Sequence, residues 1–305
     1  MCIRDRHYLL PELYDDLNSG HNVRSTVFVE TNAMYRPDGL EEMKPVGEVE
    51  FVQGLAAAGA TGLYGPAKVA ASIVGHANLN LGDRVEPVLE ALYGASTNRF
   101  RGIRHALTWD SDPRIQNNRW DLQNQLMDEN FRAGARVLAR MGFTFDAWMY
   151  FPQLPELADF AQVVPELTII LNHIGGLLRV GPYADRDDEV LPQWREGLAL
   201  VAECPNVYVK LGGIGQPRTG YDWCAREKPI GSEELAELMS PYMNYAIEQF
   251  GPERGMFESN FPPDKVGHSY NVLYNAFKIL SRDYSNTERA AMFQGTAEKV
   301  YRVDY

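Results

Sequence analysis

Short apolar runs alternate with helix-patterned segments along almost the whole of this 305-residue chain. Seven of these runs are rich in β-branched and aromatic residues and have the length of a strand. They lie at residues 24–31, 68–79, 99–107, 143–150, 167–176, 206–211 and 255–260. Strands that are regularly separated by helices pair in parallel, because each helix returns the chain to the same end of the sheet. The sequence therefore predicts an α/β fold with a parallel sheet.

The helical segments suggest which parallel architecture this is. They are predicted at residues 8–17, 48–59, 83–93, 121–141, 154–164, 190–203, 232–250, 268–282 and 286–301. The first of them has no strand before it, whereas a (β/α)₈ barrel has eight strands, each followed by its helix, in about 250 residues. We therefore expect an α/β TIM barrel that lacks its first strand, with a gap between the strands at 24–31 and 255–260. A doubly wound open sheet is the alternative, but no G-x-G-x-x-G follows the first predicted strand.

The ends and joints of the chain bear on its domain organisation. Residues 1–6, MCIRDR, fit nothing that follows and resemble the translated remnant of a sequencing adapter. We exclude them as a non-native leader and expect the natural start of the protein to be missing. No low-complexity tract or Ser/Pro-rich linker divides the remainder, so residues 7–305 are predicted to form a single domain.

Composition excludes several classes of partner. The formal net charge is −12 with dispersed acidic residues, which argues against binding to nucleic acid or to an anionic membrane. No apolar run approaches the ~18 residues of a membrane span, and no signal peptide opens the chain. The three cysteines follow no CxxC spacing, so neither a disulfide framework nor a structural zinc site is indicated. We expect a cytoplasmic protein with a small-molecule substrate, and the formation of a homo-oligomer is left open.

Polar residues stand at the carboxyl ends of the predicted strands. The clearest is His173, in the stretch LTIILNHIGG, where a buried-type strand ends in Asn-His and two glycines let the backbone turn sharply. The other candidates are Glu30, His76, Arg101, Arg104, Asp146, Lys210 and Asn260. In a barrel these ends converge on one mouth, where the active sites of this architecture lie. The set therefore predicts a site there.

Each candidate also has a structural interpretation. His173 and His76 are equally compatible with packed core histidines. Arg101 and Arg104 are three residues apart and face opposite sides of a strand, so at most one of them points into the site, where it would bind a substrate carboxylate. Lys210 is a candidate for substrate binding. For Asp146, in the middle of a strand, the structural alternative is a salt bridge to another strand, with Lys210 or an arginine as its partner.

The two glycine-rich turns, HIGG after residue 172 and LGGIG after residue 210, have two interpretations as well. Their backbone amides could cradle an anion. Such turns also occur simply because loops must leave a barrel rim tightly.

The combination of FRGIR, NHIGG, VYVKLGG, MFESNFPPDK and GTAEKVYR resembles the amidohydrolase-related TIM-barrel hydrolases, and most of all their lactonase-type branch. The resemblance runs from about residue 8 to residue 302. It implies a barrel that hydrolyses small esters, lactones or amides, although some relatives are decarboxylases. It also implies that His173 matches the histidine ending the family's sixth strand, a metal or substrate ligand, and that Arg101 or Arg104 binds substrate. Asn260 aligns with the aspartate that activates water in the family.

Two departures from the family pattern affect the expected cofactor, a divalent metal such as zinc with His173 as a ligand. The His-x-His pair after the first strand is absent, and Asn260 cannot accept a proton as a carboxylate does. Asp264, four residues further on, or Glu30 would then help to activate water. The prediction is a hydrolase acting on a small polar lactone, ester or amide at the carboxyl mouth of the barrel. A decarboxylase on the same barrel and a non-catalytic ligand-binding barrel are the alternatives.

Overall fold

The computed structural model describes residues 7–118 and 122–303. Within them, seven strands form one parallel sheet in the order β1-β2-β3-β4-β5-β6-β7. The strands are β1 (Ser25–Val29), β2 (Lys68–Gly75), β3 (Phe100–Ala106), β4 (Thr144–Trp148), β5 (Ile169–Leu171), β6 (Val207–Leu211) and β7 (Gly255–Phe257). Every predicted strand is present, and each is shorter than the apolar run that predicted it.

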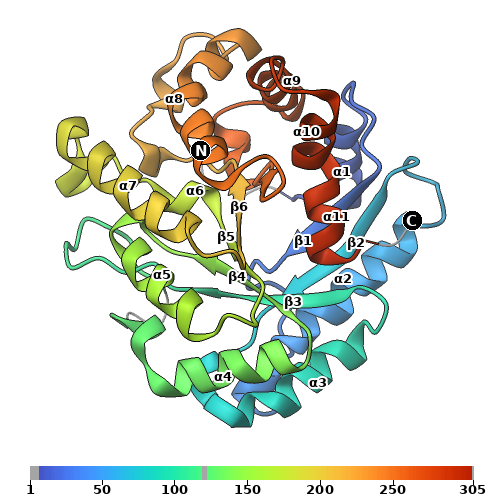
Figure 1. The fold of residues 1–305 in the computed structure, drawn as a ribbon. Coiled ribbons are helices and arrows are strands. Elements are labelled where there is room, and N and C mark those ends of the chain that lie inside the picture. The colour runs from blue at the N-terminus through green and yellow to red at the C-terminus, as the bar shows by residue number, and fades with distance from the viewer. Residues whose placement is uncertain (1–6, 119–121, 304–305) are drawn as a thin grey trace.

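The sheet curls into a barrel that stays open on one side (Figure 1). Among the described residues, no pairing joins β1 to β7, so the two strands are the edges of the gap that the sequence predicted. Residues 10–17 form a helix and supply no eighth strand. The fold is therefore an α/β TIM barrel lacking one strand, as expected. Residues 1–6, interpreted above as a leader, lie outside the described residues.

The helices surround the sheet (Figure 1). They are α1 (Leu10–Leu17), α2 (Val46–Gly59), α3 (Glu86–Ala95), α4 (Glu129–Arg140), α5 (Leu154–Val163), α6 (His173–Gly176), α7 (Asp187–Ala202), α8 (Ser232–Phe250), α9 (Tyr270–Leu280), α10 (Asn286–Ala290) and α11 (Thr296–Tyr301). None of the helices in 7–118 and 122–303 is both long enough and apolar enough to cross a membrane.

Two helix predictions were wrong in extent. The helix expected at 121–141 begins at Glu129, because Asp128 caps it by accepting the amide hydrogens of Asn130 and Phe131. The helix expected at 286–301 is divided by a π-helical turn, Ala291–Gly295, into α10 and α11.

The last helix fills part of the barrel interior. Val300 and Tyr301 of α11 pack against Val74, Ile170 and Met256, which come from β2, β5 and β7. Side chains of these three strands can meet only on the concave side of the curled sheet. As a result α11 carries the hydroxyl group of Tyr301 into the barrel, where the polar residues of the strands also point.

Candidate active site at the carboxyl ends of the strands

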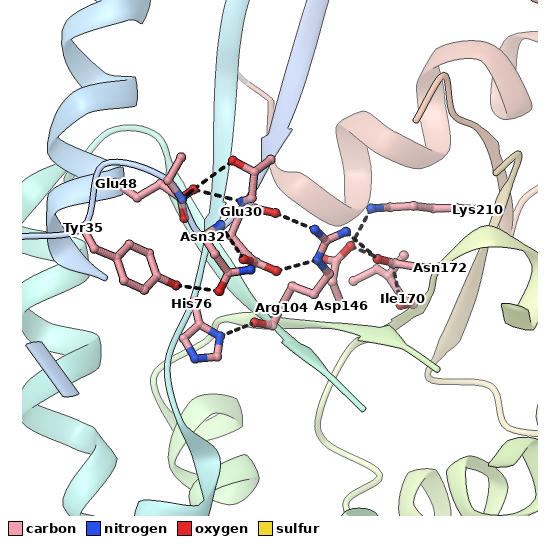
Figure 2. Close-up of polar contacts among 12 residues, drawn as sticks. Glu30, Asn32, Tyr35, Glu48, His76, Arg104, Asp146, Ile170, Asn172 and Lys210 are labelled. Carbon is pink, nitrogen blue, oxygen red and sulfur yellow. Dashed lines mark hydrogen bonds and ion pairs between the residues drawn. The ribbon is translucent and has the colours of Figure 1, made fainter. Parts of the chain in front are cut away.

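A network of charged side chains occupies the interior of the barrel (Figure 2). Arg104 Nε donates to Glu30 Oε1 at 2.8 Å, and Arg104 Nη1 lies 3.5 Å from Asn172 Oδ1. Asn172 Nδ2 donates to Asp146 Oδ1 at 3.0 Å, and Lys210 Nζ reaches the same oxygen at 2.6 Å. We call these five residues the charged network.

The charged network is internally neutralised. Asp146 is fully buried and accepts a further hydrogen bond from the Tyr301 hydroxyl at 2.9 Å, so its charge is met by three donors. The buried ion pair between Asp146 and Lys210 is one of the structural alternatives that the sequence offered for Asp146. Glu30, Arg104 and Lys210 were predicted as site residues, and the structure places them together but binds each to another member of the network.

Arg101 lies elsewhere, so its predicted place at the mouth was wrong. Its guanidinium donates to the backbone oxygens of Asn98 at 2.7 Å, Phe100 at 3.0 Å and Arg302 at 3.2 Å. It lines a cavity of about 570 Å³ at the amino ends of the strands, because it comes second in β3. Of the two arginines only Arg104 points into the barrel, in agreement with their spacing.

His76, another candidate, follows β2 and is buried. Its Nδ1 lies 2.9 Å from the backbone oxygen of Arg104, and its ring packs edge-on against His105 at 5.4 Å between centroids. These contacts place His76 beside the charged network rather than beside His173.

After β5 and Asn172, His173 begins the short segment labelled α6, which is a left-handed turn. The φ angles are 55° at His173, 48° at Ile174 and 79° at Gly175. A β-branched residue such as Ile174 rarely adopts this conformation, which costs about 1–3 kcal/mol and persists only where the surroundings impose it. Trp194 helps to impose it, because its indole Nε1 donates to the Ile174 oxygen at 2.8 Å. The strained turn fixes where the imidazole of His173 points.

Glu258, just past β7, orients the imidazole. Its Oε1 lies 2.5 Å from His173 Nδ1 and accepts the His173 backbone N–H at 3.1 Å. Burial lowers the pKa of His173 and outweighs the opposing effect of Glu258. Burial alone would raise the pKa of Glu258, but His173 and Lys210 more than offset it and the pKa is lowered. The pair is therefore a glutamate anion that accepts from the Nδ1–H of a neutral imidazole, and Nε2 carries the lone pair.

Asp264 is a second buried acid in the neighbouring loop. Only 1% of it is exposed. Its carboxylate accepts from Asn260 Nδ2 at 2.6 Å and from the Gly215 amide at 2.9 Å. Burial raises the pKa of Asp264 to about 7, against the lowering influence of Arg218 and of these two hydrogen bonds. Asn260, predicted as a catalytic residue, therefore contacts the proposed substitute for the missing aspartate directly.

The turn after β6 joins these groups. A Cβ atom added at Gly213 would lie 2.5 Å from the Cβ of His173, and one added at Gly215 would lie 2.7 Å from the Cβ of Asp264. Both distances are shorter than real Cβ atoms tolerate, so only glycine lets the turn approach the histidine and the aspartate this closely. Close packing thus accounts for the glycines at these two positions of the LGGIG motif, and His173 and Asp264 both pack against the same short turn.

Three residues of this region were missed by the sequence reasoning. Glu258 stands two positions before Asn260, and its carboxylate at the end of a predicted strand is the sequence signal that could have identified it. Trp148 ends β4 and packs edge-on against His173 at 4.7 Å between ring centroids. Arg218 comes from a single 3₁₀ turn, Pro217–Thr219, in the segment after β6, and no sequence pattern marked it.

The described residues do not fit the predicted metal. His173 could offer a metal only Nε2, because Nδ1 is taken by Glu258, and both carboxylate oxygens of Asp264 accept hydrogen bonds, from Asn260 and from Gly215. Nowhere in the described ranges do three or more His, Cys, Asp or Glu side chains gather in a way that could hold a metal ion. The proton transfers proposed for this site are therefore assigned to side chains of this chain.

Comparisons with known proteins agree with the predicted family and fold. The family model described as amidohydrolase matches residues 40–303. A protein of Sinorhizobium fredii named y4mH, itself uncharacterised, is 29% identical over 300 residues, which cover 98% of this chain and 87% of that protein. An L-fucono-1,5-lactonase of Burkholderia multivorans is 28% identical over 204 residues, covering 67% of this chain and 63% of the lactonase.

Solved structures support the architecture. An amidohydrolase from Burkholderia multivorans, crystallised with bound zinc, superposes with a TM-score of 0.74 at 23% identity, and the alignment covers 99% of this chain and 91% of that one. At this identity the likeness concerns the fold alone.

Proposed function

This chain belongs to the amidohydrolase family and is a hydrolase, and we propose that it opens the ring of a sugar-acid lactone. The observation that carries the proposal is the buried pair of His173 and Glu258, which shares one glycine turn with the buried Asp264. A lactone is an ester within a ring. Its hydrolysis needs a base for the attacking water and an acid for the leaving oxygen.

His173 is suited to be the base. The carboxylate of Glu258 holds the proton on Nδ1, so Nε2 is free to accept a proton from water. Because burial lowers the pKa of His173, the imidazole is neutral near pH 7. Water then bonds to the lactone carbonyl carbon as its proton passes to Nε2.

Asp264 is suited to be the acid. With a pKa of about 7, a large fraction of its carboxyl groups is protonated at neutral pH. When the ring C–O bond breaks, Asp264 gives its proton to the departing ring oxygen, and the product is a hydroxy acid. His173 loses its extra proton and Asp264 regains one through solvent, which restores the starting state. The reaction needs an unprotonated base and a protonated acid at the same pH. Burial provides both, because it lowers the pKa of His173 and raises the pKa of Asp264.

The test is acid release from a panel of sugar-acid lactones, followed with a pH indicator. We expect His173→Ala to lower kcat/KM by about 10²-fold or more, the range for one positioned acid–base group. Glu258→Gln should cost less, because its amide oxygen can still accept from Nδ1. Removing the anion should also lower the pKa of His173 further and move the acidic limb of the pH–rate profile to lower pH.

The matched control is His21→Ala, since His21 contacts the backbone oxygen of Asn271 and does not join the site. The assays are repeated with added zinc, because one solved relative holds it. Lactone turnover that survives His173→Ala unchanged would contradict the proposal. Carbon dioxide release in place of acid release would identify the decarboxylase alternative.

A further inference from the structure

Arg218 is a guanidinium whose hydrogen-bond acceptors are all neutral. Nη2 donates to the Gly213 backbone oxygen at 3.1 Å, and Nη1 donates to the side-chain oxygen of Gln216. Nε is buried and has no hydrogen-bond partner. In the part of the chain that the structure describes, no carboxylate forms an ion pair with it. Arg104 differs, since it is paired with Glu30 at 2.8 Å.

The position of Arg218 relates it to the proposed catalytic groups. It comes from the same loop as Gly213 and Gly215, which pack against His173 and Asp264. The guanidinium carbon lies 4.5 Å from the ring centroid of Trp148, and that ring packs edge-on against His173. A cation held against the face of an indole has a defined plane, which suits it to recognise a planar anion.

The positive charge of Arg218 is not fully compensated by neighbouring acidic groups. Burial lowers the pKa of Arg218, because the nearby Asp264, Tyr150 and Glu258 compensate for it only in part. Glu258 is already engaged by His173, and Asp264 is only partly ionised near neutral pH. A partly buried cation without an anionic partner is unfavourable, and a ligand anion would supply the missing charge.

We infer that Arg218 binds a carboxylate of the substrate, so that the preferred lactone carries a free carboxylate besides its ring ester. That the substrate is a lactone rests on the proposed function. That the substrate carries a carboxylate rests on the contacts of Arg218. It transfers to Arg218 the role that the sequence had suggested for Arg101 or Arg104. Arg101 lies at the other end of the strands, and the charge of Arg104 is met by Glu30.

The experiment compares two probes that differ only in the carboxylate, D-glucaro-1,4-lactone and D-glucono-1,4-lactone. The wild-type protein should show at least a 10-fold higher kcat/KM for the acidic lactone, as expected of one charge-assisted hydrogen bond. Arg218→Gln should lower the ratio of the two kcat/KM values by at least 10-fold. Arg218→Lys keeps the positive charge but not the planar guanidinium, so its ratio of kcat/KM values should lie between those of the wild type and of Arg218→Gln. Arg186→Gln removes an exposed arginine paired with Glu189 and should leave the ratio unchanged.

Calorimetry with the open-chain dianion glucarate and the uncharged polyol glucitol separates this inference from the proposed function. Preferential binding of glucarate that is lost in Arg218→Gln, without hydrolysis of any lactone, would support the carboxylate site and refute the hydrolysis. Hydrolysis of both lactones with equal kcat/KM, or an equal loss on both in Arg218→Gln, would overturn the inference. Failure of glucarate to bind better than glucitol would overturn it too. Circular dichroism of each variant verifies that it is folded.

Discussion

Replacing Asp264 by asparagine should impair catalysis while it stabilises the fold at alkaline pH. Asp264 is 1% exposed, and its pKa is raised from an ordinary 3.8 to about 7. A shift of about three pKa units corresponds to about 4 kcal/mol. That is roughly the cost of keeping the ionised carboxylate buried in the folded protein above pH 7.

The direction of the pH dependence follows from where the proton is held more tightly. Between pH 3.8 and about pH 7 the folded protein binds the Asp264 proton more tightly than the unfolded chain. The contribution of Asp264 to stability is therefore present in full below pH 3.8 and is lost as pH rises through 7. Asparagine has no proton to lose. The difference in unfolding free energy, variant minus wild type, should rise by about 4 kcal/mol from pH 4 to pH 8.

A constant offset accompanies this change. The amide of the new side chain can still accept from Gly215 with its oxygen, but its NH₂ group then faces the NH₂ group of Asn260. The lost hydrogen bond costs about 1–3 kcal/mol at every pH. The slope with pH, rather than the value at one pH, is the signature of the buried acid.

Activity should change in the opposite direction. Asparagine cannot give a proton to the leaving oxygen, so kcat/KM for a lactone should fall by about 10²–10⁴-fold near pH 7. The alkaline limb of the profile, expected near pH 7 in the wild type, should disappear.

The assay is urea unfolding at several pH values from 4 to 8, together with kcat/KM measured on the same preparations. Asp15→Asn is the matched control, because Asp15 is an exposed carboxylate on α1. Other buried acids, such as Glu48, titrate equally in both proteins and cancel in the difference. A difference in unfolding free energy that is the same at pH 4 and pH 8 would refute the assignment of a raised pKa. Wild-type turnover in the variant would refute the catalytic role.

Two further substitutions test the surroundings of the site. Asn260→Ala removes the 2.6 Å hydrogen bond to Asp264, and kcat/KM for a lactone should fall by an amount that corresponds to about 1–3 kcal/mol, less than in Asp264→Asn. The same substitution should raise the pKa of Asp264 and shift the alkaline limb of the pH–rate profile to higher pH. An unshifted limb would argue against the contact between Asn260 and Asp264. Lys210→Met leaves the fully buried Asp146 without its cation, and the unfolding free energy measured in urea should fall by about 3–5 kcal/mol. The double variant that also carries Asp146→Asn should recover much of this loss. A Lys210→Met protein within about 1 kcal/mol of the wild type would contradict a buried ion pair.

Sequence alone determined the architecture, because strands and helices are encoded locally. The alternation of β-branched runs with helical segments is enough to predict seven parallel strands and the gap between β1 and β7. The same local logic placed His173 and Asn260 at strand ends, and it predicted that Arg101 and Arg104 point to different places. Helix limits were less predictable, since a cap such as Asp128 depends on a few hydrogen bonds that no periodicity records.

Tertiary structure alone decided which polar groups meet. Glu30 and Arg104 are 74 positions apart and Asp146 and Lys210 are 64 apart, and their pairing requires the curvature of the sheet. Glu258 lies 85 residues from His173, so its effect on the imidazole is invisible in either segment by itself. Arg218 stands out only because folding buries its Nε atom and places its guanidinium among neutral acceptors beside Trp148. A pKa depends on burial and on charges a few ångströms away, and folding sets both.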